Sequence, residues 1–172
     1  MAYNNNYSKP QCNGNRDRGS EDKSIVPEAV KISSFYQEDG KTIKSELFDG
    51  VAKEVAESLK GKNKKGYDIG VTSTQLRRIF EEVKRFEQVL LFSDDQWEKQ
   101  LPYIKMIKSK VAYTVARAGK QKSDEKGVYK NLEIFISSCI DLINKQDDYH
   151  IFVSLFEAAY GFYYALAPKS CQ

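Results

Sequence analysis

The chain has 172 residues, which is long enough for one domain whose hydrophobic core needs neither disulfides nor a structural metal. Apolar residues make up 41% and charged residues 30%, and this balance excludes a chain that is disordered throughout. The formal net charge of +3 is too small to indicate a polyanionic partner, so the distribution of the charges carries more information than their sum.

Targeting and redox signals are weak. The first 24 residues are polar and do not form a signal peptide, and residues 151–167 have Glu157 near their centre, which argues against a membrane span. The three cysteines are widely spaced without a CxxC pair, and there is one histidine. We therefore expect reduced thiols in a cytoplasmic protein with no metal, no cofactor and no membrane contact.

The N-terminal quarter of the chain lacks helical periodicity. Residues 1–24 are rich in Asn, Gly, Ser and charge, which predicts a disordered tail. Residues 25–45 contain Pro27 and the turn-like pair Asp39-Gly40, so we expect a linker with one short ordered piece at most. Residues 1–45 are thus predicted as tail and linker.

Helical periodicity begins at Glu46. A first helix is expected from about Glu46 to Lys60, with one apolar stripe formed by Leu47, Val51, Val55 and Leu59. Gly61 is expected to end it, and residues 61–70 are expected as a loop that exposes Lys62, Lys64 and Lys65.

The second helix has the strongest start signal. Thr72 followed by Gln75 three residues later predicts a capping box. Apolar residues then recur at spacings of three and four, which predicts one buried stripe: Leu76, Ile79, Phe80, Val83, Phe86 and Leu90.

Three further helices complete the expected fold. Ser93 to Gln96 repeats the capping pattern, Pro102 interrupts or restarts the helix that follows, and Gly119 either ends this helix near Ala118 or is tolerated for one more turn. A fourth helix opens at Ser123 or Asp124, and its expected core residues are Leu132, Phe135, Cys139, Leu142 and Ile143. The last runs from Tyr149 to about Leu166, capped by Asp147 and Asp148 and stopped by Pro168. The predicted fold is all-α, a compact bundle of about five helices over residues 46–167 with a C-terminal tail at 168–172.

The segment from Leu101 to Lys122 carries an unusual charge pattern. It contains no acid and six bases: Lys105, Lys108, Lys110, Arg117, Lys120 and Lys122. On a helical wheel Lys110, Tyr113, Arg117 and Lys120 fall within roughly 80° of one another, opposite an apolar stripe, in a line about 15 Å long. Lys120 belongs to this line only if the helix continues past Gly119. Such a line can follow the phosphates of a nucleic-acid strand, with Tyr113 stacking on a base.

A solvated helix face is the alternative explanation, in which Tyr113 lies on lysine methylenes. Solvated helices normally alternate in charge sign, and this one does not, which favours an RNA-binding face. The second helix shows a weaker version, because Arg77, Arg78, Lys84 and Arg85 share their surface with Glu81 and Glu82 and pairs within the helix explain much of it.

Catalytic patterns are missing. His150 has no obvious partner and is expected at a helix start, and the acid pairs 94–95 and 147–148 stand where helix N-termini favour negative charge. Glu157 is the one acid in a largely apolar helix, and we expect it to pair with a base of a neighbouring helix or subunit. No phosphate-binding loop, dinucleotide fingerprint or HExxH motif occurs. We expect no enzymatic activity, with a small helical nuclease as the remote alternative.

The last helix is apolar on nearly every side. One face carries Tyr149, Phe152, Phe156, Tyr160, Tyr163 and Tyr164. Such a helix is either central in its bundle or shared with a partner. The alternative function is therefore a helical protein–protein adaptor that uses this aromatic helix without binding RNA directly.

Three motifs in order resemble a known family. They are residues 74–80 with Phe86, then Leu101-Pro102 leading to residues 108–113 and Arg117, then residues 156–158 with Tyr160 and Tyr163-Tyr164. This arrangement, over about residues 72–165, resembles the small subunit of the type III-A CRISPR effector, the Csm complex. The long polar N-terminus departs from the compact family pattern.

The resemblance implies a non-catalytic helical subunit that acts in antiviral defence. Several copies would stack as the inner filament of a ribonucleoprotein, beside crRNA and target RNA and in contact with the backbone and large subunits. It implies RNA contacts at Arg77, Arg78, Lys108, Lys110, Tyr113 and Arg117. The charge pattern adds Lys105, Lys120 and Lys122, and the second helix adds Lys84 and Arg85.

Overall fold

The computed structural model of the chain describes residues 24–92, 97–121, 125–168 and 171, with the backbone alone for 119–121. Over these residues the chain forms five α-helices, one short 3-10 helix and a two-stranded sheet. The helices are α1 (Gly50–Ser58), α2 (Ser73–Leu91), α3 (Trp97–Gln121), α4 (Lys126–Leu142) and α5 (Gln146–Leu166). This confirms the predicted all-α class and the number of helices.

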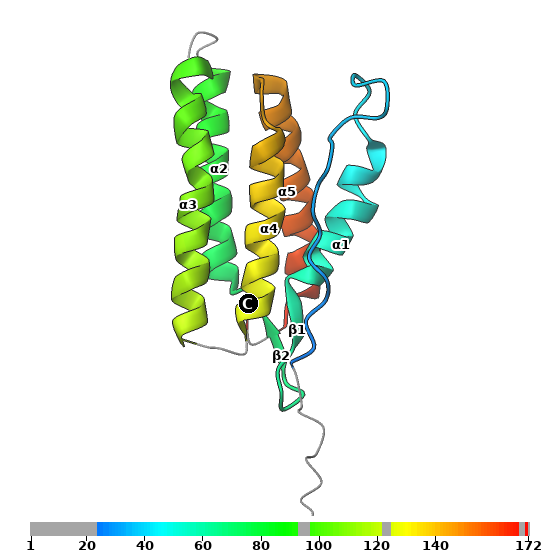
Figure 1. Ribbon diagram of the computed structural model, residues 1–172, viewed down its shortest axis with the longest axis vertical. Coiled ribbons are helices and arrows are strands. Elements are labelled where there is room, and N and C mark those ends of the chain that lie inside the picture. Colours follow the sequence, from blue (N-terminus) through cyan, green and yellow to red (C-terminus); the bar gives the residue numbers. More distant parts are fainter. Residues whose placement is uncertain (1–23, 93–96, 122–124, 169–170, 172) are drawn as a thin grey trace, which may run out of the picture.

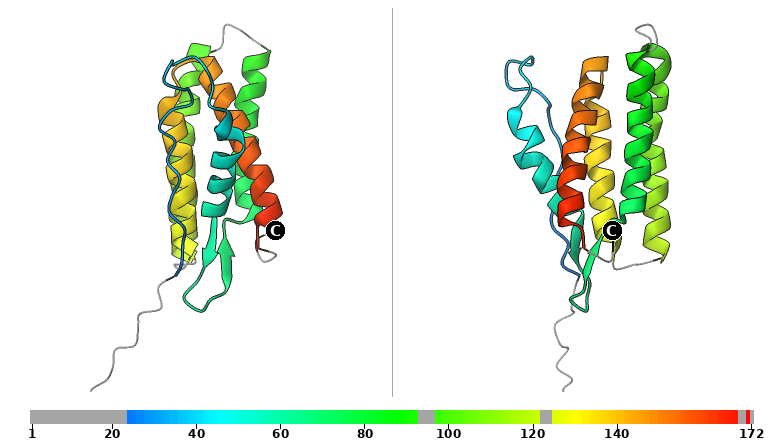
Figure 2. Two further views of the ribbon diagram at one scale, coloured as in Figure 1. Left: turned by 90° about the vertical axis from the view of Figure 1, so that its right-hand side faces the viewer. Right: turned by 180° about the vertical axis from the view of Figure 1, so that it is seen from behind.

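The helices lie side by side in three layers (Figure 1). The pair α2 and α3 forms one outer layer, α4 and α5 form the middle, and α1 lies on the other side with the segment that precedes it (Figure 2). The closest packing joins α3 to α4 and α1 to α5. In the described part of the chain no helix is both long enough and apolar enough to cross a membrane.

The predicted apolar stripe of α2 is confirmed. Leu76, Ile79, Val83, Phe86 and Leu90 are buried, and Phe80 is half-buried. Thr72 caps the helix, because its Oγ1 accepts from the Gln75 backbone N–H at 3.4 Å. The second hydrogen bond of the predicted capping box, from the Thr72 N–H to the Gln75 side chain, is not formed. The Thr72 N–H donates instead to the Tyr129 hydroxyl of α4 at 3.1 Å, so a tertiary contact replaces the local one.

The third helix, α3, is continuous, although Pro102 was expected to interrupt or restart it. It passes through Pro102 and continues past Gly119 to Gln121. Pro102 lies within the first two turns, where the proline removes one helical hydrogen bond and its exposed ring meets few neighbours. The predicted cap at residues 93–96 and the opening of the fourth helix at 123–124 lie outside the described residues. The last helix begins at Gln146, three residues before the expected start, so Asp147 and Asp148 lie within its first turn. From there Asp148 accepts from the backbone of Asn144 and Lys145, at 2.9 and 3.1 Å, and satisfies the helix start.

The last helix contributes most of its aromatic face to the core. Tyr149, Phe152, Phe156 and Tyr163 are buried, and Tyr160 stacks on Phe80 of α2 at a centroid distance of 5.1 Å. Tyr164, in contrast, is 63% exposed. The aromatic helix therefore lies mainly inside its own bundle.

The predicted first helix and the loop after it differ from expectation. Residues 46–60 are divided at Asp49 into the 3-10 helix η1 (Ser45–Phe48) and α1. The expected loop contains an antiparallel hairpin of β1 (Lys60–Lys62) and β2 (Asp68–Gly70), with Lys60 opposite Gly70 and Lys62 opposite Asp68. Strands of three residues are too short to show an alternating pattern, and pairing with distant backbone stabilises them.

The segment 24–44, expected as a linker, packs along the bundle. Ile32 and Phe35 belong to the core, at 5% and 2% exposure. The Ile32 N–H donates to Ser138 Oγ of α4 at 3.0 Å, and the Asn131 side chain donates to the Pro27 carbonyl at 2.9 Å. We therefore propose that the bundle begins before Ile32, N-terminal to the boundary expected from periodicity.

Candidate nucleic-acid interface

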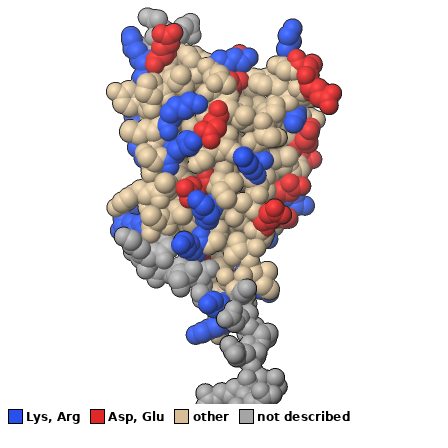
Figure 3. Space-filling view, in the orientation of Figure 1, with Lys and Arg blue, Asp and Glu red and all other residues tan. Residues whose placement is uncertain are grey.

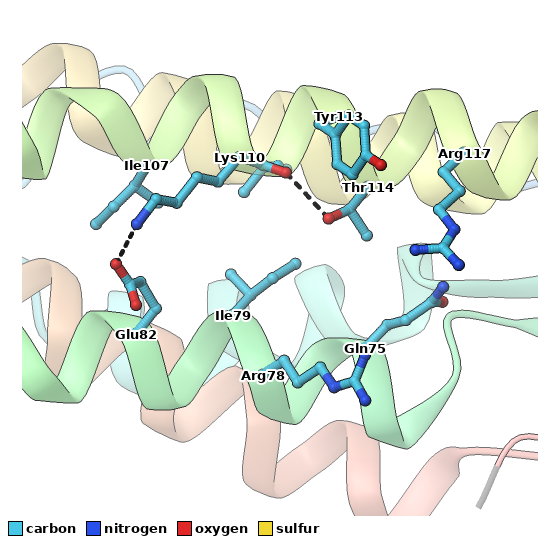
Figure 4. A pocket seen from close by; sticks show the side chains of 10 residues that line it. Gln75, Arg78, Ile79, Glu82, Ile107, Lys110, Tyr113, Thr114 and Arg117 are labelled. Carbon is cyan, nitrogen blue, oxygen red and sulfur yellow. Dashed lines mark hydrogen bonds and ion pairs between the residues drawn. The ribbon is translucent and has the colours of Figure 1, made fainter.

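A groove of about 380 Å³ separates the outer faces of α2 and α3 (Figure 4). Four residues of α2 and six of α3 line it: Gln75, Arg78, Ile79, Glu82, Ile107, Lys110, Val111, Tyr113, Thr114 and Arg117.

The inner wall of the groove is apolar. Ile79, Ile107 and Val111 reach into it from the core, with exposures of 8%, 1% and 0%. They belong to the apolar stripes by which α2 and α3 face the bundle, and the polar residues one helical step away form the rim. The groove thus combines an apolar wall with a charged edge, a combination that accepts the sugars and bases of a strand on one side and its phosphates on the other.

Two arginines occupy the end of the groove where α2 begins. Figure 4 shows Arg117 extending from α3 toward Gln75 of α2, while Arg78 extends along α2 toward the same end. Both side chains are exposed. Within the described part of the chain, no ion pair engages either guanidinium. A guanidinium without a carboxylate partner can present its planar set of N–H donors to a phosphate.

The other end of the groove is neutralised by an acid. Lys110 Nζ forms a short ion pair with Glu82 Oε1, and Arg85 Nη2 approaches the same oxygen at 2.9 Å. The hydrogen bond from Lys110 is the main cause that lowers the pKa of Glu82 below its ordinary value, ahead of the bond from Arg85. Glu82 therefore stays ionised at neutral pH and competes with any phosphate for these two cations.

Tyr113 stands on the rim without a ring partner among the described residues. Its side chain is 68% exposed, and it lies between Lys110 and Arg117 along α3. The structure thus places Lys110, Tyr113 and Arg117 on one face, as the helical wheel predicted. The opposite stripe, from Ile104 to Ala118, is buried. The helix backbone continues through Lys120, but the side chain of Lys120 and all of Lys122 lie outside what the structure describes.

Other predicted contact residues lie outside the groove and have partners. Arg77 pairs with Glu81 at 2.8 Å, and Lys84 pairs with Glu87 at 2.7 Å and with Glu157 of α5 at 3.2 Å. The expectation that Glu157 pairs with a base of a neighbouring helix is thereby confirmed. Arg85 lies over the ring of Phe86 in addition to its contact with Glu82.

Lys105 and Lys108 face α4. Lys108 pairs with Asp141 at 2.6 Å. Lys105 Nζ donates to the carbonyls of Ile140 and Ile143 at 2.6 and 2.8 Å, so it satisfies the C-terminal end of α4. Desolvation lowers the pKa of Lys105, which the charge of Asp141 partly opposes. This geometry assigns Lys105 a structural contact that its place in a run of bases did not reveal.

The groove is also lined by residues that the sequence analysis did not select as RNA contacts. Gln75, expected only as a capping residue, lies at the arginine end of the groove, and Thr114 lines its α3 side. In the sequence, these positions are marked only as polar residues beside an apolar stripe. Every amphipathic helix has such residues, so the pattern alone does not single them out.

Groups with catalytic potential are dispersed. Among the described residues no three His, Cys, Asp or Glu side chains gather as a metal site would require. His150 Nδ1 lies 3.7 Å from Glu87, an arrangement that fits a partly exposed helix start. Burial raises the pKa of the Cys139 thiol well above its ordinary value, which disfavours the reactive thiolate.

Comparison with known proteins identifies the family. Searches of curated proteins and of solved structures gave no match. A family model described as Csm2 Type III-A matches residues 42–167, which include both walls of the groove and all five α-helices. This confirms the resemblance carried by the three sequence motifs. The chain belongs to the Csm2 type III-A family and is a small subunit of the type III-A Csm complex.

Proposed function

We propose that this subunit binds RNA by its phosphate backbone in the α2–α3 groove and performs no chemistry on it. The observation that carries the proposal is the pair Arg78 and Arg117, two exposed guanidinium groups at one end of the groove without an acid partner in the described chain. Membership of a CRISPR effector subunit family supports RNA as the polyanion.

The groove suits a strand read by shape and charge. Phosphates would lie along the rim from Lys110 to Arg117, about 10 Å at 1.5 Å per residue. Tyr113 would stack on a base, a contact that tolerates any base because every base has an aromatic face. Contacts of this kind bind without regard to sequence, as a subunit that accompanies many different guides requires.

The proposal places the subunit beside crRNA and target RNA in the cytoplasm. Copies of the chain would stack as an inner filament against the backbone and large subunits of the complex, and cleavage would belong to those other subunits. The adaptor alternative, which uses the aromatic helix, receives less support, because four of the seven aromatic side chains of α5 are buried within the subunit.

Charge reversal at the groove tests the proposal. The full chain carrying Arg78→Glu and Arg117→Glu should bind unrelated single-stranded RNAs about tenfold more weakly or worse. The slope of log affinity against log salt should fall by about 1.4, since each lost phosphate contact removes about 0.7. Fluorescence anisotropy over a salt series measures both quantities.

A matched variant separates the groove from net charge. Lys31 and Lys53 are exposed on the α1 side of the bundle, away from α2 and α3. Reversing both to Glu changes the charge by the same amount and should leave most of the affinity. Equal losses in the two variants, or binding that does not respond to salt, would overturn the proposal.

A further inference from the structure

The hairpin β1–β2 projects past the ends of the helices (Figures 1 and 2). It carries Lys60, Lys62, Lys64 and Lys65 against one acid, Asp68, a net charge of +3. That equals the formal net charge of the entire chain, so the other residues balance one another. Figure 3 shows basic side chains at this end of the molecule.

The hairpin cations are available to a ligand. Lys62, Lys64 and Lys65 are exposed, and no ion pair involving a hairpin lysine occurs in the described part of the chain. Beside them Tyr67 is 67% exposed. Cations interleaved with an unstacked aromatic ring are typical of surfaces that bind single-stranded nucleic acid.

The turn that carries these side chains is well fixed. Asn63 Oδ1 accepts from the backbone N–H groups of Lys65 and Tyr67 at 2.9 and 3.0 Å. The Asn63 N–H donates to the Tyr67 carbonyl at 2.9 Å, and Gly66 takes the positive φ of +79° that closes the turn. A turn already ordered in this way loses little further conformational entropy when a ligand binds.

The hairpin is anchored to the rest of the molecule at two places. Lys62 exchanges two backbone hydrogen bonds with Ile25, at 2.8 and 2.9 Å. Gly61 permits this approach, because a Cβ there would lie 2.6 Å from the Ile25 carbonyl oxygen. Just after the other strand, the carbonyl of Val71 accepts from the Tyr163 hydroxyl of α5 at 2.5 Å.

The hairpin also lies at the arginine end of the groove. After β2 ends at Gly70, only Val71 and Thr72 precede the start of α2, whose first turns carry Gln75 and Arg78. A strand that leaves the groove past Arg78 and Arg117 therefore emerges on the side of the molecule from which the lysines project.

We propose that the β1–β2 hairpin is a second phosphate-binding element, which holds an RNA strand where it leaves the α2–α3 groove. That the bound strand is RNA rests on the proposed function, but the hairpin is a surface separate from the α2–α3 groove. RNA is favoured over an anionic membrane because the exposed aromatic ring and the adjoining arginine groove both suit a strand.

Two RNA lengths and two variants of the full chain test this inference. The hairpin variant replaces Lys62, Lys64 and Lys65 by Gln, and the groove variant carries Arg78→Glu and Arg117→Glu. For an RNA of about 20 nucleotides, the hairpin variant should bind about tenfold more weakly than the unmodified chain, with a salt slope lower by about 2. For an RNA of about five nucleotides, which the groove alone can hold, the hairpin variant should bind like the unmodified chain. A control with Lys31, Lys41 and Lys53 changed to Gln removes the same charge elsewhere.

The outcomes separate the two proposals. If the hairpin variant keeps both its affinity and its salt slope for the long RNA, the hairpin inference fails and the groove is unaffected. If the groove variant binds normally while the hairpin variant is weakened, the proposed groove function fails and the hairpin remains a nucleic-acid contact. Sedimentation with phosphatidylserine vesicles provides a further arm: loss of vesicle binding in the hairpin variant, with RNA binding intact, would replace RNA by a membrane and overturn the inference.

Discussion

Lys105 illustrates how one cation in a basic helix can serve the fold. Its ammonium group donates to the carbonyls of Ile140 and Ile143, the groups that a helix end leaves without partners. We expect Lys105→Met to lower the free energy of unfolding by about 1–2 kcal/mol, because two charge-assisted hydrogen bonds at the negative end of a helix are lost. RNA affinity should remain unchanged. Urea denaturation and anisotropy measure the two effects.

The pH dependence of the stability tests the same role of Lys105 in a second way. Burial lowers the folded-state pKa of Lys105 below its ordinary value of 10.5. In the alkaline range between the two pKa values the unfolded chain binds more protons at this site, so the site adds stability as the pH rises. The stability difference between the unmodified chain and the Met variant should therefore widen toward pH 10. If Lys105→Met leaves the stability unchanged and weakens RNA binding, Lys105 is an RNA contact and not a structural residue.

The groove between α2 and α3 holds one acid among its lining residues, and that acid limits the number of cations available. Glu82 binds both Lys110 and Arg85. We expect Glu82→Gln to raise RNA affinity about threefold to tenfold and to steepen the salt slope by about 0.7 for each cation released to a phosphate. The cost in stability should be under about 1 kcal/mol, as for most partly exposed ion pairs.

Glu81→Gln is the matched control for this prediction. It removes the same charge from the same helix, but Glu81 pairs with Arg77 outside the groove, and both side chains are well exposed. Its effect on RNA affinity should be clearly smaller. Equal gains from the two variants would indicate a general charge effect and would contradict the specific role of Glu82.

Helical elements differ in how far the sequence determines them. The long stripe of α2 is visible in periodicity alone, since a 19-residue amphipathic helix repeats its pattern several times. The face of α3 with Lys110, Tyr113 and Arg117 follows from the same geometry. The hairpin was missed because its three-residue strands depend on Ile25 and Tyr163, which are distant in sequence.

Site membership was harder to predict than the fold, because it depends on what lies opposite each base. Lys108 and Lys110 are two residues apart on α3, yet Lys108 meets Asp141 of α4 while Lys110 meets Glu82 of α2. A charge count treats them alike. Only the packing of α3 between its neighbours separates a cation at the groove from one that faces the bundle.

At the scale of the whole molecule, the segment that precedes the family match is part of the folded domain. The match begins at residue 42, but Ile32 and Phe35 lie in the core, and Tyr36 donates to the carboxylate of Asp148 at 2.7 Å. Asn131 of α4 joins the segment to α1, donating to the carbonyls of Pro27 and Ser58 at 2.9 Å each. The segment therefore connects α1, α4 and the start of α5.

A chain trimmed to residues 42–172 should consequently be far less stable than one that begins at residue 24. Removing a buried Phe and a buried Ile costs about 2–5 kcal/mol each in other cores, and the trimmed chain also loses the partners of Ser138, Asn131 and Asp148. Since domains of this size are stable by only about 5–15 kcal/mol, we expect the trimmed chain to be partly unfolded at 37 °C. Thermal unfolding followed by circular dichroism compares the two chains, and the double variant Ile32→Ala/Phe35→Ala in the longer chain should reproduce most of the loss. Equal melting temperatures for both chains would show instead that the family-matched region folds independently, with the segment as a passive cover.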